Sequence, residues 1–160
     1  MHDQPTPEQF REAFGAQIYR PAGAQAKVTR NSGWGGSGNG ISHLSLQFLI
    51  GSREESVIIE VSNEERNRTD PVNALMHLVF EFALVRRPRF PMLIERGKQP
   101  LPVDGRSRTF TTYTARPATV AVASIGGRGV MIRCATNRLP RLALEPITTE
   151  ELKRALRPRR

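Results

Sequence analysis

The sequence predicts a single α+β domain spanning residues 1–160, in which an antiparallel β-hairpin and a β-meander pack around a central apolar helix at about residues 71–87. Three observations predict this class. The length of 160 residues suits one domain. The strand-like segments come in runs and do not alternate with helices. One segment is apolar almost all round, and short helical patterns mark both termini.

The N-terminal pattern predicts a short helix. Thr6 is a typical N-cap residue, and Pro7 suits the first helical position. Phe10, Phe14 and Ile18 then recur at intervals of four and share one face of the predicted helix. Pro21 ends the predicted helix because the residue before a proline disfavours the helical conformation.

Residues 31–40 (NSGWGGSGNG) contain five glycines, and we expect them to form a glycine-rich loop because ordering so many glycines costs conformational entropy. The segment fits the GxGxxG pattern, but a strand pattern follows it where a nucleotide-binding fold would have a helix. Two interpretations stay open. The loop is either a flexible connection, or it forms a backbone anion site in which Arg30 and Trp34 contribute to binding.

A β-hairpin follows this segment. In residues 42–50 and 57–61, apolar and polar side chains alternate, which is typical of strands with one buried face. Residues 51–55 supply the turn.

The central helix is predicted over residues 71–87, with Asp70 as its cap and Pro71 in its first turn. Its polar stripe is one residue wide and includes His77 and Glu81. A helix that is apolar on nearly all sides must be covered on nearly all sides. Either the two β segments sandwich it, or a second chain covers it. His77 and Glu81 are either a metal-binding or acid–base pair, or the polar remnant of a packed helix.

The remainder of the chain predicts a meander and a C-terminal helix. Thr148 begins a capping box for a short helix that ends near residue 157, and residues 158–160 form a frayed basic tail. The predicted strands, separated by turn residues such as Asp104 and Gly105, are 92–95, 99–103, 108–114, 119–124, 130–134 and 141–144.

The charge is unevenly distributed along the chain. The net charge is +9 overall, with 7 basic and 9 acidic residues up to Asp70 and 17 basic and 6 acidic residues from Pro71 onward. A basic half favours nucleic acid, an anionic surface or an acidic protein as partner. The alternative is a solvated arginine-rich surface of no specific function, since 21 of the 24 basic residues are arginine.

A nucleic-acid interface would use the second half of the chain. Arginine suits phosphate because its planar guanidinium can bond two oxygens at once. The main candidates for phosphate binding are Arg86, Arg87, Arg89, Arg106 and Arg108, and the further ones are Arg96, Lys98, Arg128, Arg133, Arg138 and Arg141. The aromatic residues that could stack on bases are Trp34, Phe90, Phe110 and Tyr113, although the alternation places Phe110 in the core.

Several classes are excluded at the level of sequence. Cys134 is the only cysteine, so neither an intrachain disulfide nor a cysteine-based zinc site is expected, and the alternation places Cys134 in the core. No apolar run is long enough for a spanning helix, and the first ten residues do not resemble a signal peptide, so we expect a cytoplasmic protein with no membrane contact. No cofactor, metal site or catalytic residue is predicted.

Three hypotheses for the function remain. The leading one is a non-enzymatic protein-interaction or regulatory module that acts alone or as a homodimer, because an all-round apolar helix calls for a cover. The alternative is a nucleic-acid-binding protein that uses the arginine-rich second half. The third is an enzyme that binds a small ligand or phosphate through the glycine-rich loop.

Overall fold

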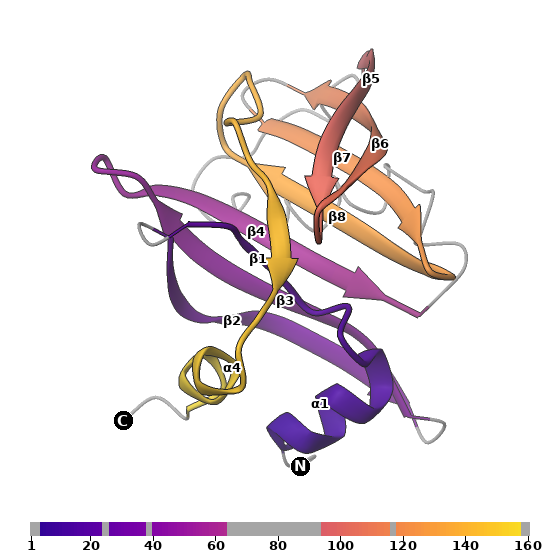
Figure 1. The fold of residues 1–160 in the computed structure, drawn as a ribbon, viewed down its shortest axis with the longest axis vertical. Coiled ribbons are helices and arrows are strands. Elements are labelled where there is room, and N and C mark those ends of the chain that lie inside the picture. Colours follow the sequence, from indigo (N-terminus) through magenta and orange to yellow (C-terminus); the bar gives the residue numbers. More distant parts are fainter. Residues whose placement is uncertain (1–3, 24–25, 38–39, 64–93, 116–117, 158–160) are drawn as a thin grey trace, which may run out of the picture.

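In the computed structural model, the described residues form mostly β-structure, together with two short helices, one towards each end of the chain (Figure 1). The structure describes residues 4–23, 26–37, 40–63, 94–115 and 118–157. In chain order the elements are α1 (Pro7–Phe14), β1 (Tyr19–Pro21), β2 (Lys27–Ser37), β3 (Gly40–Ile50), β4 (Glu55–Ser62), β5 (Ile94–Val103), β6 (Arg106–Ala115), β7 (Ala118–Ile125), β8 (Arg128–Cys134), β9 (Leu144–Pro146) and α4 (Thr149–Ala155).

The strands form one nine-stranded sheet with the order β1-β9-β5-β6-β7-β8-β4-β3-β2. Neighbouring strands pair antiparallel, except for β5 and β9, which are parallel. The sheet curls into a nearly closed barrel. Figure 1 shows β5–β8 in the upper part of the molecule, and α1, α4 and both chain ends at the lower end.

The predicted α+β class with a central helix is wrong. The core of the described residues lies inside the curled sheet, where inward side chains of successive strands meet, and the helical contribution comes from α1 and α4. The physical reason is that alternating strands supply a continuous apolar face, which buries itself once the sheet curls. The helix predicted at residues 71–87 lies outside the described residues.

The predicted hairpin is confirmed by the pairing of β3 with β4. The predicted alternation also holds, because the members of the core that these two strands supply recur at every second position. They are Leu44, Leu46 and Phe48 from β3, and Val57, Ile59 and Val61 from β4. The opposite face of β4 is buried as well, with the Glu60 carboxylate accepting a hydrogen bond from Ser45 Oγ at 2.5 Å.

The N-terminal helix begins as predicted but ends earlier. Thr6 caps α1 by accepting a hydrogen bond from the Gln9 amide, and Phe10 is fully buried. The helix ends at Phe14 because Gly15 adopts a φ of 60°, which leaves the helical region. Ile18 therefore lies outside the helix, although it is still part of the core.

The glycine-rich loop predicted at 31–40 is also wrong, because residues 31–37 belong to β2 and Gly40 begins β3. The two strands pair along their whole length, with three register shifts. Glycine is required there for close packing: a Cβ on Gly35 would lie 2.1 Å from the His43 ring. The glycines therefore permit a neighbouring side chain to lie against the strand.

The meander is confirmed in its main strands and corrected at its ends. The described part of the 92–95 pattern, residues 94–95, and the 99–103 pattern belong to a single strand, β5, and the strand predicted at 141–144 is replaced by β9 at Leu144–Pro146. The predicted C-terminal helix is confirmed as α4, which Thr148 caps. No helix in the described ranges combines the length and apolar character that a membrane crossing requires. The predicted tail, 158–160, lies outside the described residues.

A buried arginine joins the two ends of the chain. Arg20 in β1 is only 7% exposed, and its guanidinium contacts Glu151 of α4 at 2.8 Å and Glu145 of β9 at 2.8 Å. It also donates to the carbonyl oxygen of Ala26 at 2.8 Å. A charge taken out of water is tolerated when it is paired and hydrogen-bonded, so this cluster fixes β1, β9 and α4 to one another.

We therefore expect Arg20→Met to lower the free energy of unfolding by about 2–3 kcal/mol, because it leaves Glu151 without its buried partner. Urea unfolding followed by circular dichroism measures the change. Lys27→Met, at an exposed position of β2, is the control and should change stability by less than about 0.5 kcal/mol. Equal effects of the two substitutions would contradict the role assigned to Arg20.

Candidate functional site

Two cavities of similar volume stand out among the described residues. The first, of about 510 Å³, lies where the end of β1, the β3–β4 turn and the segment leading into β9 meet, and we call it the side hollow. The second, of about 490 Å³, lies at the end of the barrel that carries the start of β5 and the end of β6, and we call it the end pocket.

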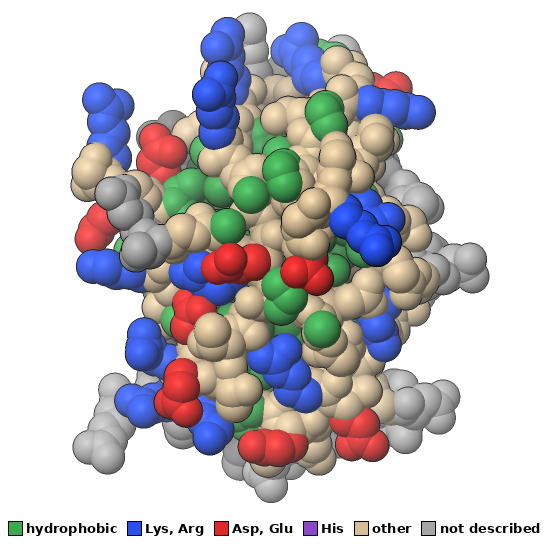
Figure 2. Space-filling model, in the orientation of Figure 1, with side chains coloured by type: hydrophobic (Ala, Val, Ile, Leu, Met, Phe, Trp, Pro, Cys, Tyr) green, Lys and Arg blue, Asp and Glu red, His purple; other side chains and the backbone are tan. Residues whose placement is uncertain are grey.

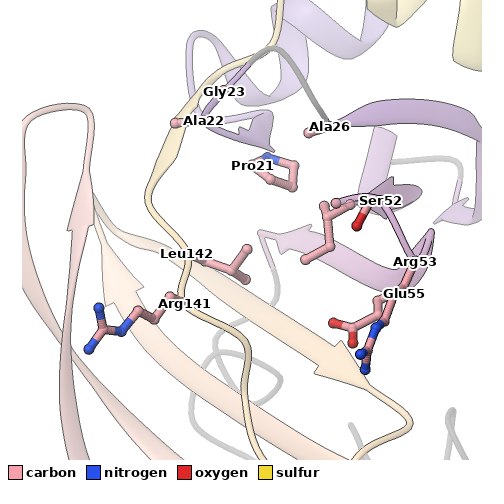
Figure 3. Close-up of a pocket in the computed structure, with 11 residues that line it drawn as sticks. Pro21, Ala22, Gly23, Ala26, Ser52, Arg53, Glu55, Arg141 and Leu142 are labelled. Atoms are coloured by element: carbon pink, nitrogen blue, oxygen red, sulfur yellow. The ribbon is translucent and has the colours of Figure 1, made fainter.

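The side hollow has an apolar floor and charged groups at its rim. Pro21, Ala26 and Leu142 contribute to the floor, and Arg53 and Arg141 contribute to the rim. Figure 3 shows the Arg141 guanidinium extending away from the cavity, whereas Arg53 lies on the opposite side. Hydrophobic side chains also gather over this region in Figure 2. The side hollow therefore offers contact surface and few polar groups directed inward.

The end pocket, in contrast, is lined mainly by polar side chains from β5, β6, β7 and the segment after β8. In Figure 1 these elements meet at the upper end of the molecule, opposite the two helices. Its lining residues are Arg96, Gln99, Thr112, Thr114, Thr119, Asn137, Arg138 and Leu139.

A β-bulge positions Arg96 at the end pocket. Glu95 pairs with Tyr113 and Gly97 pairs with Thr112, so Arg96 is an extra residue with no partner in the register. Bulges change the direction of a side chain, and Gly97 permits this one with a φ of 127°. Arg96 Nε then donates to Thr114 Oγ1 at 3.3 Å, which fixes the guanidinium over the end of β6.

Three threonine hydroxyl groups form the base of the end pocket. Thr112 and Thr114 continue the inward face of β6 beyond Phe110, which is fully buried in the core. Thr119 of β7 pairs with Thr114 in the register, and all three threonines are at most 8% exposed. The inner surface of the barrel thus changes from apolar to hydroxyl side chains towards this end.

The segment after β8 closes one side of the end pocket and is held by hydrogen bonds. Thr119 Oγ1 donates to the carbonyl oxygen of Thr136 at 2.6 Å. Thr136 Oγ1 and Cys134 Sγ both donate to the carbonyl oxygen of Arg138, at 2.8 and 3.6 Å. Cys134 is buried, as predicted, and with Thr136 it anchors the turn that carries Asn137 and Arg138.

The end pocket has positive character. It is lined by two arginines, and none of the described lining residues is acidic. Glu95, the nearest carboxylate in sequence to Arg96, pairs with Tyr113, whose pKa is raised above its usual value by burial and additionally by this carboxylate. On the face shown in Figure 2, the upper end carries mainly Lys and Arg, while most acidic side chains lie lower.

This arrangement is suited to binding an anion. Guanidinium groups form strong, charge-assisted hydrogen bonds with phosphate and carboxylate oxygens. The described lining residues include no imidazole, thiol or carboxylate that could move a proton near neutral pH. No group of three His, Cys, Asp or Glu side chains within the described part of the chain lies close enough to hold a metal ion.

The residues predicted to bind in the glycine-rich segment belong to a paired strand. Trp34 is partly buried against the core, with its ring centroid 6.4 Å from that of Phe10 at an interplanar angle of 79°. This edge-to-face contact makes Trp34 a packing residue. The backbone of Arg30 pairs with Gln47 of β3, and its side chain is not described.

Of the five main candidate arginines, the structure describes Arg106 and Arg108, and neither lines the end pocket. Arg106 and Arg108 pair with Val103 and Leu101, at the opposite end of β6 from the end pocket. Arg106 is exposed and Arg108 is half-buried, with its Nε buried and lacking a hydrogen-bond partner among the described residues. Further predicted residues lie outside the described ranges, and these are His77, Glu81, Arg86, Arg87 and Arg89.

Other basic residues of the second half hold the fold together. Arg128 donates to the Asn63 side chain at 2.8 Å and to the carbonyl oxygen of Ala13 at 3.0 Å, and it also bonds Gln17, so it ties α1 to β8. Arg133 is only 2% exposed. These two residues are therefore not available to an external polyanion.

Arg96 and Arg138 were predicted only as further candidates in the arginine-rich second half, and the polar side chains that line the end pocket with them were not predicted. One pattern could have indicated the site. Phe110, Thr112 and Thr114 share one strand face, so the core-facing row continues with hydroxyl groups. A row that changes from apolar to polar while staying buried indicates a polar cavity.

The strained backbone of the β-bulge, which positions Arg96 at the end pocket, can be tested by substituting Gly97. We expect Gly97→Ala to lower the free energy of unfolding by about 1–2 kcal/mol, because alanine rarely adopts the φ of 127°. Gly33→Ala is the matched control in β2. An added Cβ there meets nothing within 4 Å, and the φ of Gly33 lies outside the left-handed region that alanine avoids. Thermal unfolding of both variants measures the difference, and equal stability would contradict the strained bulge.

Comparison with known proteins adds no family to this description. No protein-family model, curated protein or solved structure matches the chain. A function is therefore inferred from the chemistry of the two cavities alone.

Proposed function

We propose that the protein is a non-enzymatic binding module with a regulatory role, which recognises a small anion in the end pocket. The observation that carries this proposal is the placement of Arg96 and Arg138 over a base of buried hydroxyl groups, without an acidic residue in the described lining. A cavity of about 490 Å³ has the size of a small-molecule site.

The hydrogen bonding of the Arg96 guanidinium supports the proposal. Its Nε is fixed by Thr114, while no described residue bonds its two terminal nitrogens. A guanidinium held in this way loses little conformational freedom when it binds a ligand, and its remaining donors match two oxygens of one anion. Arg138 supplies a second positive charge from a turn that is itself anchored by Cys134 and Thr136.

A regulatory role follows from where Arg138 lies. The segment between β8 and β9 contributes Arg138 to the end pocket, and Arg141 and Leu142 to the side hollow. An anion bound to Arg138 would contact the same short segment that also borders the side hollow. The regulatory role that we propose is that binding at the end pocket changes the shape of the side hollow through this segment.

A protein partner, or a second copy of the chain, is the second candidate. It is favoured by the apolar floor of the side hollow, which the face in Figure 2 exposes. Sedimentation velocity at low and high protein concentration tests self-association. A single monomeric species at every concentration, with and without phosphate, would remove the homodimer.

The anion site is tested by isothermal titration calorimetry with inorganic phosphate at 50 mM salt or less. We expect a stoichiometry of one and a Kd of about 0.1–1 mM, since two charge-assisted contacts must offset the cost of binding a small ion. Arg96→Gln and Arg138→Gln should each raise the Kd about tenfold or more. Arg53→Gln, at the rim of the side hollow, is the control and should leave it unchanged.

Two results would contradict the proposal. The first is no binding of phosphate by the unaltered protein. The second is an equal loss of binding in Arg53→Gln and Arg96→Gln, which would indicate general attraction to a basic surface. Binding of a single-stranded oligonucleotide in the absence of phosphate binding would favour the nucleic-acid alternative.

A further inference from the structure

We infer that the anion recognised in the end pocket also carries hydroxyl groups, as a sugar phosphate or a sugar acid does. This inference rests on the proposed function and adds the class of ligand. It comes from the hydrogen bonds that the pocket's own polar groups make, and from those that they leave open.

The threonine hydroxyls at the base act as acceptors towards a ligand. Each hydroxyl has one proton to donate and two lone pairs to accept with. Thr112 Oγ1 uses its proton on the carbonyl oxygen of Gly97 at 3.1 Å, and Thr119 Oγ1 uses its proton on that of Thr136 at 2.6 Å. Within the described residues, neither oxygen accepts a hydrogen bond. A fully deprotonated carboxylate or phosphate monoester group cannot donate to them, whereas a hydroxyl group of the ligand can.

Two side-chain amides add further hydrogen-bond donors and acceptors to the end pocket. Gln99 and Asn137 both line the end pocket, and no hydrogen bond joins either amide to another described residue. Each amide offers a donor and an acceptor. Gln99 pairs with Phe110 in the register and is half-buried, so its amide lies between the core and the cavity.

The end pocket thus combines positively charged donors with neutral acceptors. Arg96 and Arg138 supply positive charge, and Thr114 Oγ1, which accepts from Arg96, keeps its proton for a ligand. Thr112, Thr119 and the two amides supply acceptors. A ligand that satisfies both kinds of group carries an anionic group and several hydroxyl groups. Leaving the buried acceptors of Thr112 and Thr119 unmatched would lower the affinity for ligands without hydroxyl groups.

The lining also disfavours a nucleotide. Leu139 is the only described lining side chain that is wholly apolar, and none of the described lining residues is aromatic. A nucleobase gains much of its binding energy by stacking on aromatic rings. A base in the end pocket would lack that surface, whereas a sugar needs hydrogen-bonding groups.

The test compares ligands that share an anionic group and a six-membered ring, one member of each pair with hydroxyl groups and the other without them. Calorimetry with glucose 6-phosphate and with cyclohexyl phosphate makes one pair, and glucuronate with cyclohexanecarboxylate makes the other. We expect the hydroxylated member of at least one pair to bind at least tenfold more tightly than its partner. The pair that shows the preference identifies the anionic group as phosphate or carboxylate.

A variant assigns the preference to the end pocket. Gln99→Met removes an amide that bonds no described residue, so the fold should tolerate it, and it should reduce the preference for the hydroxylated ligand at least threefold. Lys98→Met, at the neighbouring exposed position, is the matched control and should keep the full preference.

The outcomes separate the two proposals. Equal Kd values within both pairs, or a preference that Gln99→Met leaves intact, would overturn the hydroxylated ligand while the anion site stands. If none of these ligands binds, and inorganic phosphate does not bind either, both the ligand class and the proposed function are wrong.

Discussion

The inward row of β6 is the constraint on which the account of this protein depends. One alternating row joins the buried Phe110 to Thr112 and Thr114, so the same register that seals the core also directs the hydroxyl groups into the end pocket. Pairing with β7 places Thr119 beside Thr114. Because side chains alternate with a period of two, a shift of one residue would turn the hydroxyls outward and bring Tyr113 inward. The site is therefore a consequence of sheet register.

Features set by neighbouring residues were predictable from the sequence, and those set by distant residues were not. The Thr6 and Thr148 caps and the β3–β4 hairpin follow from local patterns, and the structure confirms them. The fold class depends on the curling of the whole sheet, which no local pattern specifies. The glycine-rich segment was misjudged because its strand pairing depends on β3, including the His43 ring that lies against Gly35.

The candidate site shows the same limit. The number of arginines suggested an anionic partner, but their positions along the chain did not indicate which of them are available. Arg20 and Arg128 are engaged in internal contacts, and Arg133 is buried. Arg96 is directed to the end pocket by a bulge that depends on the β5–β6 register and on Gly97. Charge composition favoured an anionic partner as a hypothesis, and only the fold shows which arginines line the candidate site.

The most direct test of the central claim is a ¹H–¹⁵N NMR titration of the labelled protein with inorganic phosphate at constant ionic strength. The account predicts that amide signals of residues 96–99, 112–114, 119 and 137–139 shift together along one saturable curve, while those of α1 and α4 stay in place. Shifts that spread over basic residues throughout the surface, or that never saturate, would contradict a defined anion site at the end of the barrel.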